Sequence, residues 1–546
     1  MPGRATRFVI VLAVIYTLFL SYFSIRAHWA LQTAMNDLGN MEQAIWQASQ
    51  GNFTMPVSNH VYPSIVSRTA IHANFIFLLI APFYKILPYS ETLLFLTTFA
   101  CAAAGLGLYF YARHHLRQSP WAVIVPAAFW LSPMVQDANL WDFHVVTLST
   151  AFLVWAAWSI DTGRLKLGWA FLVLAILCKE NMILVLAAYG LYLCLTRREK
   201  LGLQVIIFAA AYGILVLNFL IPAFTGKVSL MGPDNRFDWL LLEPQATLLQ
   251  KVEKILTHLG KLSQNRIFFY LLLSGGLAAL SAWPVFIIAI PEVLVGMLAG
   301  TSWMTRITGT YYWITSTAVV MMACTLAARP ALERNKKPFS LIYLLSATLL
   351  FSFLFSPLPY GLASSMENFQ VRETAALLQE INESMDPEQP LCVQNNIGAH
   401  FSKRRDVAVF PGRCRRPYQY LLFYLRWTPG PDLGYFAKTS LSTTYQFARP
   451  QSFINFAKKH LDSSRWGLIF QKEGFYLLEK GTASYTGREE IQQIFHEDAG
   501  IFMQEYRQAV QSRYWWSGYL NGGGQFSHLP QVWKRILHGP SRKNLS

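Results

Sequence analysis

Four short polar segments interrupt the long apolar stretches of this sequence, and each carries ionisable side chains. They are Asn36 to Glu42, Arg68 to His72, Gln136 to His144, and Lys179 to Asn181. Carboxylates and imidazoles can take up a proton during a reaction, and lysine or arginine can stabilise a negatively charged leaving group. If the four segments converge, they could form one site that combines a general base with a binding site for an anion.

Asp37 is the most informative of these residues, because it lies on the first polar loop after an apolar stretch at residues 8–25. A carboxylate in that position could act as a general base at the membrane face. A structural alternative is a helix cap before Met41 to Gln47, since Asn and Asp favour that position. The two roles do not exclude each other.

The other ionisable residues also have structural alternatives. Asp142 and His144 could satisfy one another at the start of a helix. Lys179 and Glu180 favour a functional role more strongly, because ionisable residues between short membrane spans are costly and mark functional sites or paired contacts. Glu292 lies inside an apolar run and is subject to the same argument with less weight, since near a helix end its side chain could reach the membrane surface.

The composition places the chain among integral membrane proteins. Of its 546 residues, 53% are hydrophobic, 15% are aromatic and only 14% are charged, which is too apolar for a soluble protein of this length. The net charge of +16 does not indicate nucleic-acid binding, because most cations lie beside apolar stretches, where the positive-inside rule and anionic lipids account for them. We therefore expect membrane lipids, and no nucleic acid, among the partners.

Apolar stretches long enough to cross a bilayer occur throughout residues 1–358. A helix needs about 20 apolar residues to cross the bilayer core, and on that measure we predict about eleven spans. They lie at 8–25, 90–112, 120–135, 143–160, 166–179, 181–196, 203–224, 267–282, 284–300, 310–328 and 339–356. The first one has the character of a signal sequence, but no small-residue cleavage site precedes Arg26, so we expect a retained anchor.

The positions of the cations predict how the chain is oriented in the inner membrane. With a cytoplasmic N-terminus, the positive-inside rule is satisfied by the basic clusters at 113–117, 164–166, 197–200 and 329–337. This orientation requires that residues 70–87 do not cross the membrane. That segment is amphipathic, and we predict that it lies along the outer surface as an interfacial helix. All four polar segments then lie on the outer side, the first two within an outer loop at 26–89.

After residue 358 the apolar runs shorten, and the pattern predicts an extracytoplasmic α/β domain at 359–481. Helices are expected at 368–384 and 453–461, strands at 391–393 and 407–410, and a hairpin at 466–479. Cys392 and Cys414 could form a disulfide if this domain faces an oxidising compartment. Residues 482–546 are predicted to hold a helix near 488–511 and then a basic, aromatic tail.

The polar segments also carry a resemblance to a known family. The sequence resembles a broad prokaryotic family of polytopic membrane proteins of unknown function, which is related to the GT-C superfamily of lipid-carrier-dependent glycosyltransferases. The matching residues are Asp37-Leu38-Gly39 with Glu42 to Trp46, His72 with Ala81 to Tyr84, Asn139 to His144, Lys179 to Asn181, and Gln394 to His400 followed by Arg404 or Arg405. The chain departs from the family at Ala73-Asn74, where Ser-Pro is common, and at Tyr311-Tyr312, where a His-Tyr pair is expected.

This resemblance implies a mainly α fold: a polytopic transmembrane helical bundle of GT-C type with a C-terminal extracytoplasmic α/β domain. It also implies a membrane glycosyltransferase that uses a polyprenyl-phosphate-linked sugar donor, modifies a cell-envelope acceptor, and inverts the anomeric carbon.

Such a reaction needs a carboxylate that takes the acceptor's proton or holds a metal, and cations that stabilise the departing phosphate. The expected base is Asp37, with Glu180 or Asp142 as a second carboxylate. The residues expected to bind substrate are Arg68, His72, His144, Lys179 and Arg306. The two histidines could instead complete a divalent-metal site, and the sequence identifies no cofactor.

Two other functions remain open. A multi-pass transporter or flippase would line its path with intramembrane charges such as Lys179, Glu180 and Glu292. It predicts these charges around a cavity at the middle of the membrane, whereas an enzyme predicts them beneath the first outer loop. A non-catalytic scaffold is the second alternative, and the clustering of ionisable groups on one face disfavours it.

Overall fold

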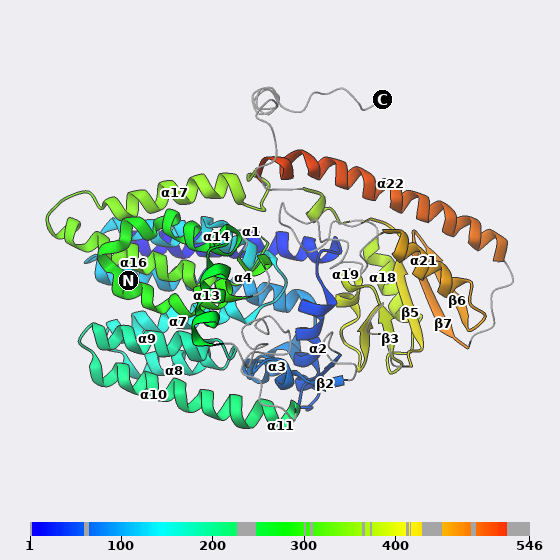
Figure 1. Ribbon diagram of the computed structural model, residues 1–546, viewed down its shortest axis with the longest axis horizontal. Coiled ribbons are helices and arrows are strands. Elements are labelled where there is room, and N and C mark those ends of the chain that lie inside the picture. Colours follow the sequence, from blue (N-terminus) through cyan, green and yellow to red (C-terminus); the bar gives the residue numbers. More distant parts are fainter. Residues whose placement is uncertain are drawn as a thin grey trace.

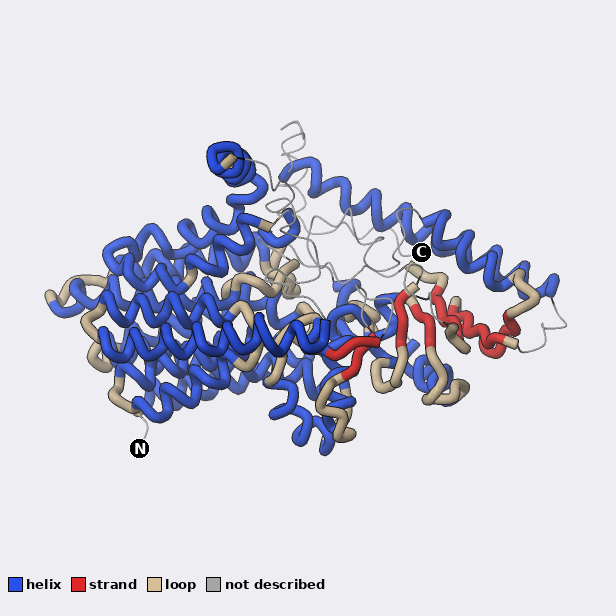
Figure 2. Tube along the Cα trace, turned by 60° about the horizontal axis from the view of Figure 1, so that its bottom comes forward, coloured by secondary structure: helices blue, strands red, loops and turns tan. Residues whose placement is uncertain are grey.

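The computed structural model shows a helical bundle joined to a smaller unit that contains a β-sheet (Figure 1). The structure describes residues 3–58, 65–225, 247–299, 302–305, 309–362, 366–371, 374–410, 414, 417–427, 450–481 and 488–520. Helices of the bundle run side by side at one end of the molecule, and the strands gather at the other end (Figure 2). The predicted architecture, a helical bundle followed by an α/β unit, is confirmed.

Five helical stretches in the described part of the chain are long and apolar enough to cross a membrane. They are α1 (Arg4–Trp29), α4 (Ser90–His115), α16 (Ile314–Glu333), and the composite stretches Glu199–Phe224 and Asn265–Ile288. Each coincides with a predicted span. Their exposed faces carry large apolar side chains such as Phe8, Leu18 and Phe219, as a surface in contact with lipid requires.

The other predicted spans are shorter apolar helices. They are η3 with α5 (Pro120–Leu131), α7 (Val145–Asp161), α8 (Leu165–Ile176), α9 (Met182–Leu195) and α17 (Phe339–Phe355). The predicted span 284–300 is broken instead, because η6 (Leu277–Ile288) ends before α15 (Ile290–Leu298), where Pro291 lies in the first turn and cannot donate a helical hydrogen bond. The predicted interfacial helix is α3 (Ile76–Ile86).

The β-sheet of the C-terminal unit, residues 374–520, has five strands in the order β4-β3-β5-β7-β6. Its strands are β3 (Leu391–Val393), β4 (Val407–Val409), β5 (Tyr420–Tyr424), β6 (Trp466–Lys472) and β7 (Phe475–Lys480). The strand β3 lies between β4 and β5 and is parallel to both, and the remaining pairs are antiparallel. The predicted strands and the predicted hairpin are confirmed, whereas β5 was not predicted.

Helices cover both faces of this sheet. Leu377 and Ile381 of α18 (Thr374–Glu383) share one apolar core with Val393. On the opposite face, α21 (Pro450–Leu461) and the long helix α22 (Arg488–Leu520) contribute Phe453 and Phe502 to a second core. The helix α22 runs along the edge of the unit (Figure 1). The start of the predicted tail therefore packs as part of the C-terminal unit.

The polar residues 30–75, which we call the first loop, lie between the bundle and the C-terminal unit. Their longest helix is α2 (Asn40–Ser49). Its fully buried Glu42 accepts hydrogen bonds from Tyr84, Ser90 and Ser402, each at 2.6 Å. One carboxylate therefore joins the first loop, two membrane-side helices and the C-terminal unit. Burial raises the pKa of Glu42, and the three hydroxyl donors oppose that shift.

A stacked pair of imidazoles also joins the C-terminal unit to the end of α1. The His28 and His400 rings lie 4.0 Å apart, and His400 Nε2 is 3.2 Å from the His28 carbonyl oxygen. Burial lowers the pKa of His400 well below its ordinary value of 6.5, and the neighbouring His28 acts in the same direction. Protonation of this interface is therefore unfavourable.

We predict that docking of the C-terminal unit weakens as the pH falls. Because the folded-state pKa of His400 is depressed, the unfolded chain binds the proton first, and stability falls by up to about 1.4 kcal/mol for each pH unit below the ordinary pKa. Thermal unfolding in detergent between pH 7.5 and 5.5 measures this slope. The variant His400→Gln keeps a donor for the His28 carbonyl and should flatten the slope, whereas His460→Gln, on α21, should not. A wild-type slope retained in His400→Gln contradicts the assignment.

A disulfide links Cys392 on β3 to Cys414, with a sequence separation of 22 residues and Cα atoms 5.8 Å apart. This is the pair that the sequence analysis named. The other four cysteines are free.

We predict that the double variant Cys392→Ser/Cys414→Ser lowers the free energy of unfolding of the C-terminal unit by about 3 kcal/mol, because the unfolded chain gains loop entropy. Limited proteolysis across a temperature series measures the loss. Cys194→Ser, which removes a free cysteine, serves as the control. Equal protease resistance of wild type under reducing and non-reducing conditions would count against a structural bond.

Candidate functional site

Asp37 lies on a π-helical turn, η1 (Met35–Gly39), at the junction of the bundle and the C-terminal unit. We call residues 34–39 the Asp37 turn. The Asp37 side chain is 33% exposed, so it can meet a substrate, whereas Met35 and Leu38 beside it are buried. The helix α2 follows, and its N-cap residue is Gly39. Asp37 is therefore not the cap of α2, which was the structural alternative.

Asp142 holds this turn from the membrane side. Its Oδ2 accepts hydrogen bonds from the backbone N–H groups of Ala34, at 3.0 Å, and Leu38, at 3.2 Å. Asp142 lies between α6 (Pro133–Leu140) and α7, with φ of 52°. This is a left-handed conformation that Asp tolerates better than most residues. The buried carboxylate thus serves the Asp37 turn and is not simply a partner for His144.

The two carboxylates titrate in different surroundings. Burial raises the pKa of Asp142 well above its ordinary range, and the charge of Asp37 acts in the same direction. Two nearby carboxylates resist being ionised together, so the more buried one retains its proton. Burial and the neighbouring charge therefore favour the neutral form of Asp142, and Asp37 is the more exposed of the two carboxylates.

His144 lies next to Asp37 and is fixed by an aromatic neighbour. Its Nε2 is 3.8 Å from Asp37 Oδ1. Its ring stacks on Tyr311, with ring centroids 3.5 Å apart and planes inclined by 13°. The Tyr311 hydroxyl donates to Tyr312 at 2.9 Å. The charges of Lys179 and Arg68 also act on this ring.

Arg68 is a buried cation within electrostatic range of Asp37. Its guanidinium donates to Asn74 Oδ1 at 2.8 Å and to Asn40 Oδ1. Burial lowers the pKa of Arg68 to about 10, while the charges of Glu180 and Asp37 oppose that shift. Arg68 therefore stays positively charged at neutral pH.

Glu180 connects the turn between α8 and α9 to the first loop. Its Oε1 lies 2.7 Å from His72 Nδ1, and its Oε2 accepts the Ala73 N–H at 3.0 Å. Burial by itself would raise the pKa of Glu180, but His72 and Lys179 lower it below the ordinary range. This carboxylate is therefore ionised and is bound to His72 and to the Ala73 N–H.

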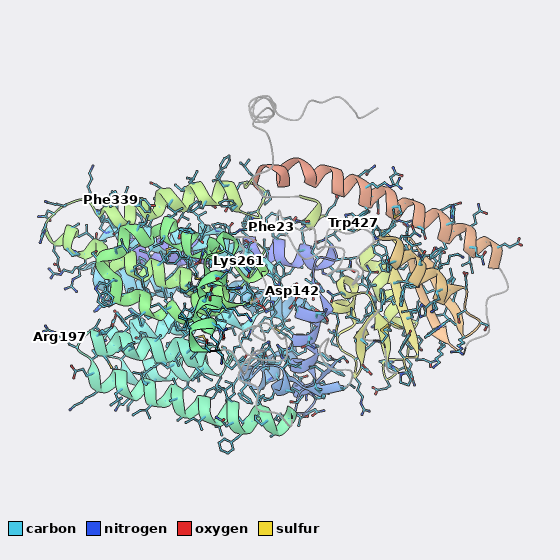
Figure 3. The ribbon with its side chains drawn as sticks, viewed as in Figure 1. Phe23, Asp142, Arg197, Lys261, Phe339 and Trp427 are labelled. Carbon is cyan, nitrogen blue, oxygen red and sulfur yellow. A yellow bond between two sulfur atoms is a disulfide. The ribbon has the colours of Figure 1, made fainter. Side chains whose placement is uncertain are left out.

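The structure brings the predicted site residues together. Asp37, Asp142 and His144 are in contact or hydrogen-bonded through the Asp37 turn, His72 is paired with Glu180, and Arg68 and Lys179 act electrostatically on the same groups. Figure 3 labels Asp142 near the middle of the molecule, where the bundle meets the C-terminal unit. The predicted substrate residue Arg306 lies outside the described residues.

Three further residues belong to this site and were not assigned to it from the sequence. Tyr311 supports His144, Asn74 binds Arg68, and Asn395 of the C-terminal unit accepts a hydrogen bond from the Asn36 N–H at 3.0 Å. Two signals pointed toward them. Tyr311 and Asn74 both stand where the chain departs from the pattern of the family that it resembles, and Asn395 lies in a family-like motif.

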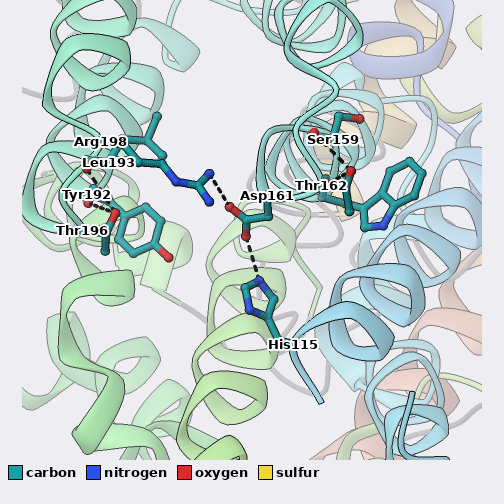
Figure 4. A network of polar contacts seen from close by, with 9 residues as sticks. His115, Ser159, Asp161, Thr162, Tyr192, Leu193, Thr196 and Arg198 are labelled. Atoms are coloured by element: carbon teal, nitrogen blue, oxygen red, sulfur yellow. Dashed lines mark hydrogen bonds and ion pairs between the residues drawn. The ribbon is translucent and has the colours of Figure 1, made fainter. Parts of the chain in front are cut away.

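A second ionisable cluster lies at the other end of α7 (Figure 4). Asp161 binds His115 Nε2 at 2.7 Å and Arg198 at 2.8 Å. His144 precedes the first residue of α7 and Asp161 is its last, so a helix of this length holds the two clusters about 25 Å apart. This cluster joins three helices at the end of the bundle that also carries the basic segments 113–117 and 197–200.

A metal site was left open by the sequence. Within the described ranges, the structure contains no group of three His, Cys, Asp or Glu side chains placed to hold a metal ion. The divalent-metal expectation for His72 and His144 stays a prediction.

Comparisons with known proteins address the family and the fold. A family model described as "Predicted membrane protein (DUF2079)" matches residues 27–428, more than half of the chain. No curated protein matches the sequence. Crystal structures of ArnT from Cupriavidus metallidurans are similar at low identity. The apo form aligns at 15% identity over 86% of this chain and 97% of that chain, with a TM-score of 0.41. The form bound to undecaprenyl phosphate aligns at 13% identity over 88% and 98%, with a TM-score of 0.41.

We predict that Asp142 can be replaced by a neutral acceptor but not by a residue without one. Asp142→Asn keeps an oxygen for the Ala34 and Leu38 N–H groups and tolerates the left-handed backbone, so its thermal stability should match that of the wild type. Asp142→Gly removes the strain of the left-handed backbone but leaves two buried N–H donors unsatisfied. The expected loss in the free energy of unfolding is about 2 kcal/mol or more. Hydrogen exchange of residues 34–39 should rise only in the glycine variant. Equal exchange in both variants would show that the carboxyl does not hold the turn.

Proposed function

We propose that this chain, which belongs to the DUF2079 family of predicted membrane proteins, is a membrane glycosyltransferase. Its donor is a polyprenyl-phosphate-linked sugar, and its acceptor is a component of the cell envelope. One observation carries the proposal: an accessible carboxylate, Asp37, lies within electrostatic range of a buried cation, Arg68, at one end of an apolar helical bundle.

The chemistry follows from these groups. The acceptor oxygen forms a bond to the anomeric carbon of the sugar while the bond from that carbon to the phosphate oxygen breaks. The proton of the acceptor hydroxyl passes to Asp37, and the bonding electrons leave with the lipid phosphate. Arg68 and Lys179 stabilise the charge on that phosphate. Attack opposite the leaving group inverts the anomeric carbon.

The surrounding groups support this division of roles. A general base has to be ionised before the reaction, and the neighbouring Asp142 favours that state by remaining neutral. Glu180 is paired with His72, so it positions the first loop rather than taking the proton. His144, held against Tyr311, is placed to orient the acceptor beside Asp37.

Two features support an extracytoplasmic location for the site. The disulfide between Cys392 and Cys414 belongs to the same unit that contacts the Asp37 turn, and disulfides persist in oxidising compartments. The basic segments gather at the opposite end of the bundle, around His115 and Arg198, where the positive-inside rule places the cytoplasm. We infer an inner-membrane enzyme whose C-terminal unit faces outward.

The transport alternative rested partly on Glu292. Its Oε2 accepts hydrogen bonds from the Ser316 N–H, at 2.8 Å, and from the Ser316 hydroxyl. Ser316 lies in the first turn of α16, where N–H groups have no partner within the helix. Glu292 therefore has a structural function as a cap from a neighbouring helix, and the other charges lie at the end of the bundle.

We predict that Asp37→Asn lowers transfer at least about 10³-fold, because the amide cannot accept the proton. The assay incubates purified protein with radiolabelled polyprenyl-phosphate sugars and cell-envelope acceptors, and follows label in the acceptor. The control Asp462→Asn removes a surface carboxylate just after α21, paired with Lys458, and should keep wild-type activity. Both variants should insert and melt like the wild type. Turnover by Asp37→Asn close to the wild-type rate removes Asp37 from this role.

A further inference from the structure

We propose that the C-terminal unit is part of the catalytic machinery, because its residue Asn395 positions the Asp37 turn. The inference rests on the proposed function for its catalytic consequence. The hydrogen bond from the Asn36 N–H to Asn395, which we call the clamp, can be tested without an activity assay. Asn395 is a positioning residue: it acts on the base through the backbone of the residue that precedes it.

The Asp37 turn is held from two sides by side chains from different units. From the bundle, Asp142 accepts the N–H groups of Ala34 and Leu38. From the C-terminal unit, Asn395 Oδ1 accepts the N–H of Asn36 at 3.0 Å. A π-helical turn of five residues leaves its first N–H groups without partners inside the turn. External acceptors for the N–H groups of Ala34, Asn36 and Leu38 therefore fix the backbone on both sides of the base.

Close backbone packing seats the C-terminal unit on the same turn. A Cβ atom on Gly398 would lie 2.7 Å from Met35 Cβ, and one on Gly39 would lie 3.1 Å from the Cα atom of Ala399. Glycine on each side allows this approach. The short helix α19 (Asn395–Gly398) thus lies directly against η1, and a small displacement of either one moves the other.

Asn395 is itself rigidly held, because it follows β3, a strand paired on both sides within the sheet. The preceding residue, Gln394, donates its N–H to Leu422 O at 3.3 Å, and its Oε1 accepts the Tyr424 N–H at 3.1 Å. Its Nε2 donates to Asn396 Oδ1 at 2.7 Å. The disulfide begins at Cys392 on the same strand. The sheet therefore provides the stiff support that a positioning contact requires.

Other contacts keep the unit docked when the Asn395 contact is removed. Gln43 donates to Arg404 O at 2.9 Å, Ser402 donates to Glu42, and the His28 and His400 rings stack. Loss of the Asn395 side chain should therefore leave the interface intact and loosen only the Asp37 turn. A base that is displaced by about 1 Å can cost about 10²-fold in rate, whereas donor binding at Arg68 and Lys179 should persist.

The test compares Asn395→Ala with Asn395→Asp and with the control Asn382→Ala. Asn382 accepts a hydrogen bond from Arg404 within the C-terminal unit and is not part of the Asp37 turn. We expect Asn395→Ala to lower kcat between about 10-fold and 100-fold with little change in KM for the donor. Its amide exchange should rise at residues 34–39 only. Asn382→Ala should match the wild type in both measurements.

Asn395→Asp gives a signature that a purely structural residue would not. It restores the acceptor for Asn36, so exchange should return to the wild-type rate. It also places a second carboxylate near Asp37, which disfavours ionisation of the base. The acid limb of the kcat profile should therefore move to higher pH, with activity recovering as the pH rises.

The outcomes separate this inference from the proposed function. Unchanged exchange and unchanged kcat in Asn395→Ala would overturn the clamp. If wild-type protein transfers no sugar from any donor tested, the proposed function fails, and the exchange experiment still decides whether Asn395 holds the turn. Global melting of Asn395→Ala at the temperature of the wild type, together with faster exchange at 34–39, supports the local role.

Discussion

The site depends on one constraint, which is that backbone amides buried where the bundle meets the C-terminal unit must find acceptors. The Asp37 turn carries an accessible carboxylate on buried backbone, so its N–H groups are shielded from water that could otherwise satisfy them. Asp142 and Asn395 supply the missing acceptors. An unsatisfied buried donor costs about 1–3 kcal/mol, which is enough to make alternative conformations of the turn competitive. The geometry of the base is therefore set by residues that never need to touch a substrate.

The three carboxylates around the turn, Asp37, Asp142 and Glu180, lie in different electrostatic environments. Burial beside another carboxylate disfavours ionisation of Asp142, Glu180 is ionised and paired with His72, and Asp37 remains accessible. Arg68 keeps its charge although it is buried, because its pKa falls only to about 10. The proposed reaction needs both a persistent cation and an accessible carboxylate near it. Arg68 and Asp37 meet these two requirements.

Much of this arrangement could be predicted from the sequence, and the failures have physical causes. The spans and the hairpin at 466–479 could be predicted from the local pattern of apolar residues. The four polar segments could be recognised because ionisable side chains are costly to bury. The strand β5 (Tyr420–Tyr424) was missed because all five residues are buried, so it lacks the alternation that identifies a strand with one exposed face. The partner of Asp142 was also missed, because the bond runs to backbone atoms more than 100 residues away. The family-like motif containing Asn395 could be seen, but its contact with Asn36 depends on tertiary docking.

Asn36 is held by a residue as distant in sequence as Asn395 because the first loop has too little regular structure to fix its own backbone. Between α1 and α3 the described chain has only the helix α2, two three-residue strands and short turns. Elements this short cannot hold a defined shape without tertiary support. The membrane helices can support the loop from one side only, since the other side faces away from the bundle. A compact sheet, closed by a disulfide and covered on both faces, supplies the second side. The C-terminal unit and the first loop therefore form one structural entity although they are far apart in sequence. Neither the bundle nor the C-terminal unit alone supplies all the hydrogen-bond acceptors that the Asp37 turn needs.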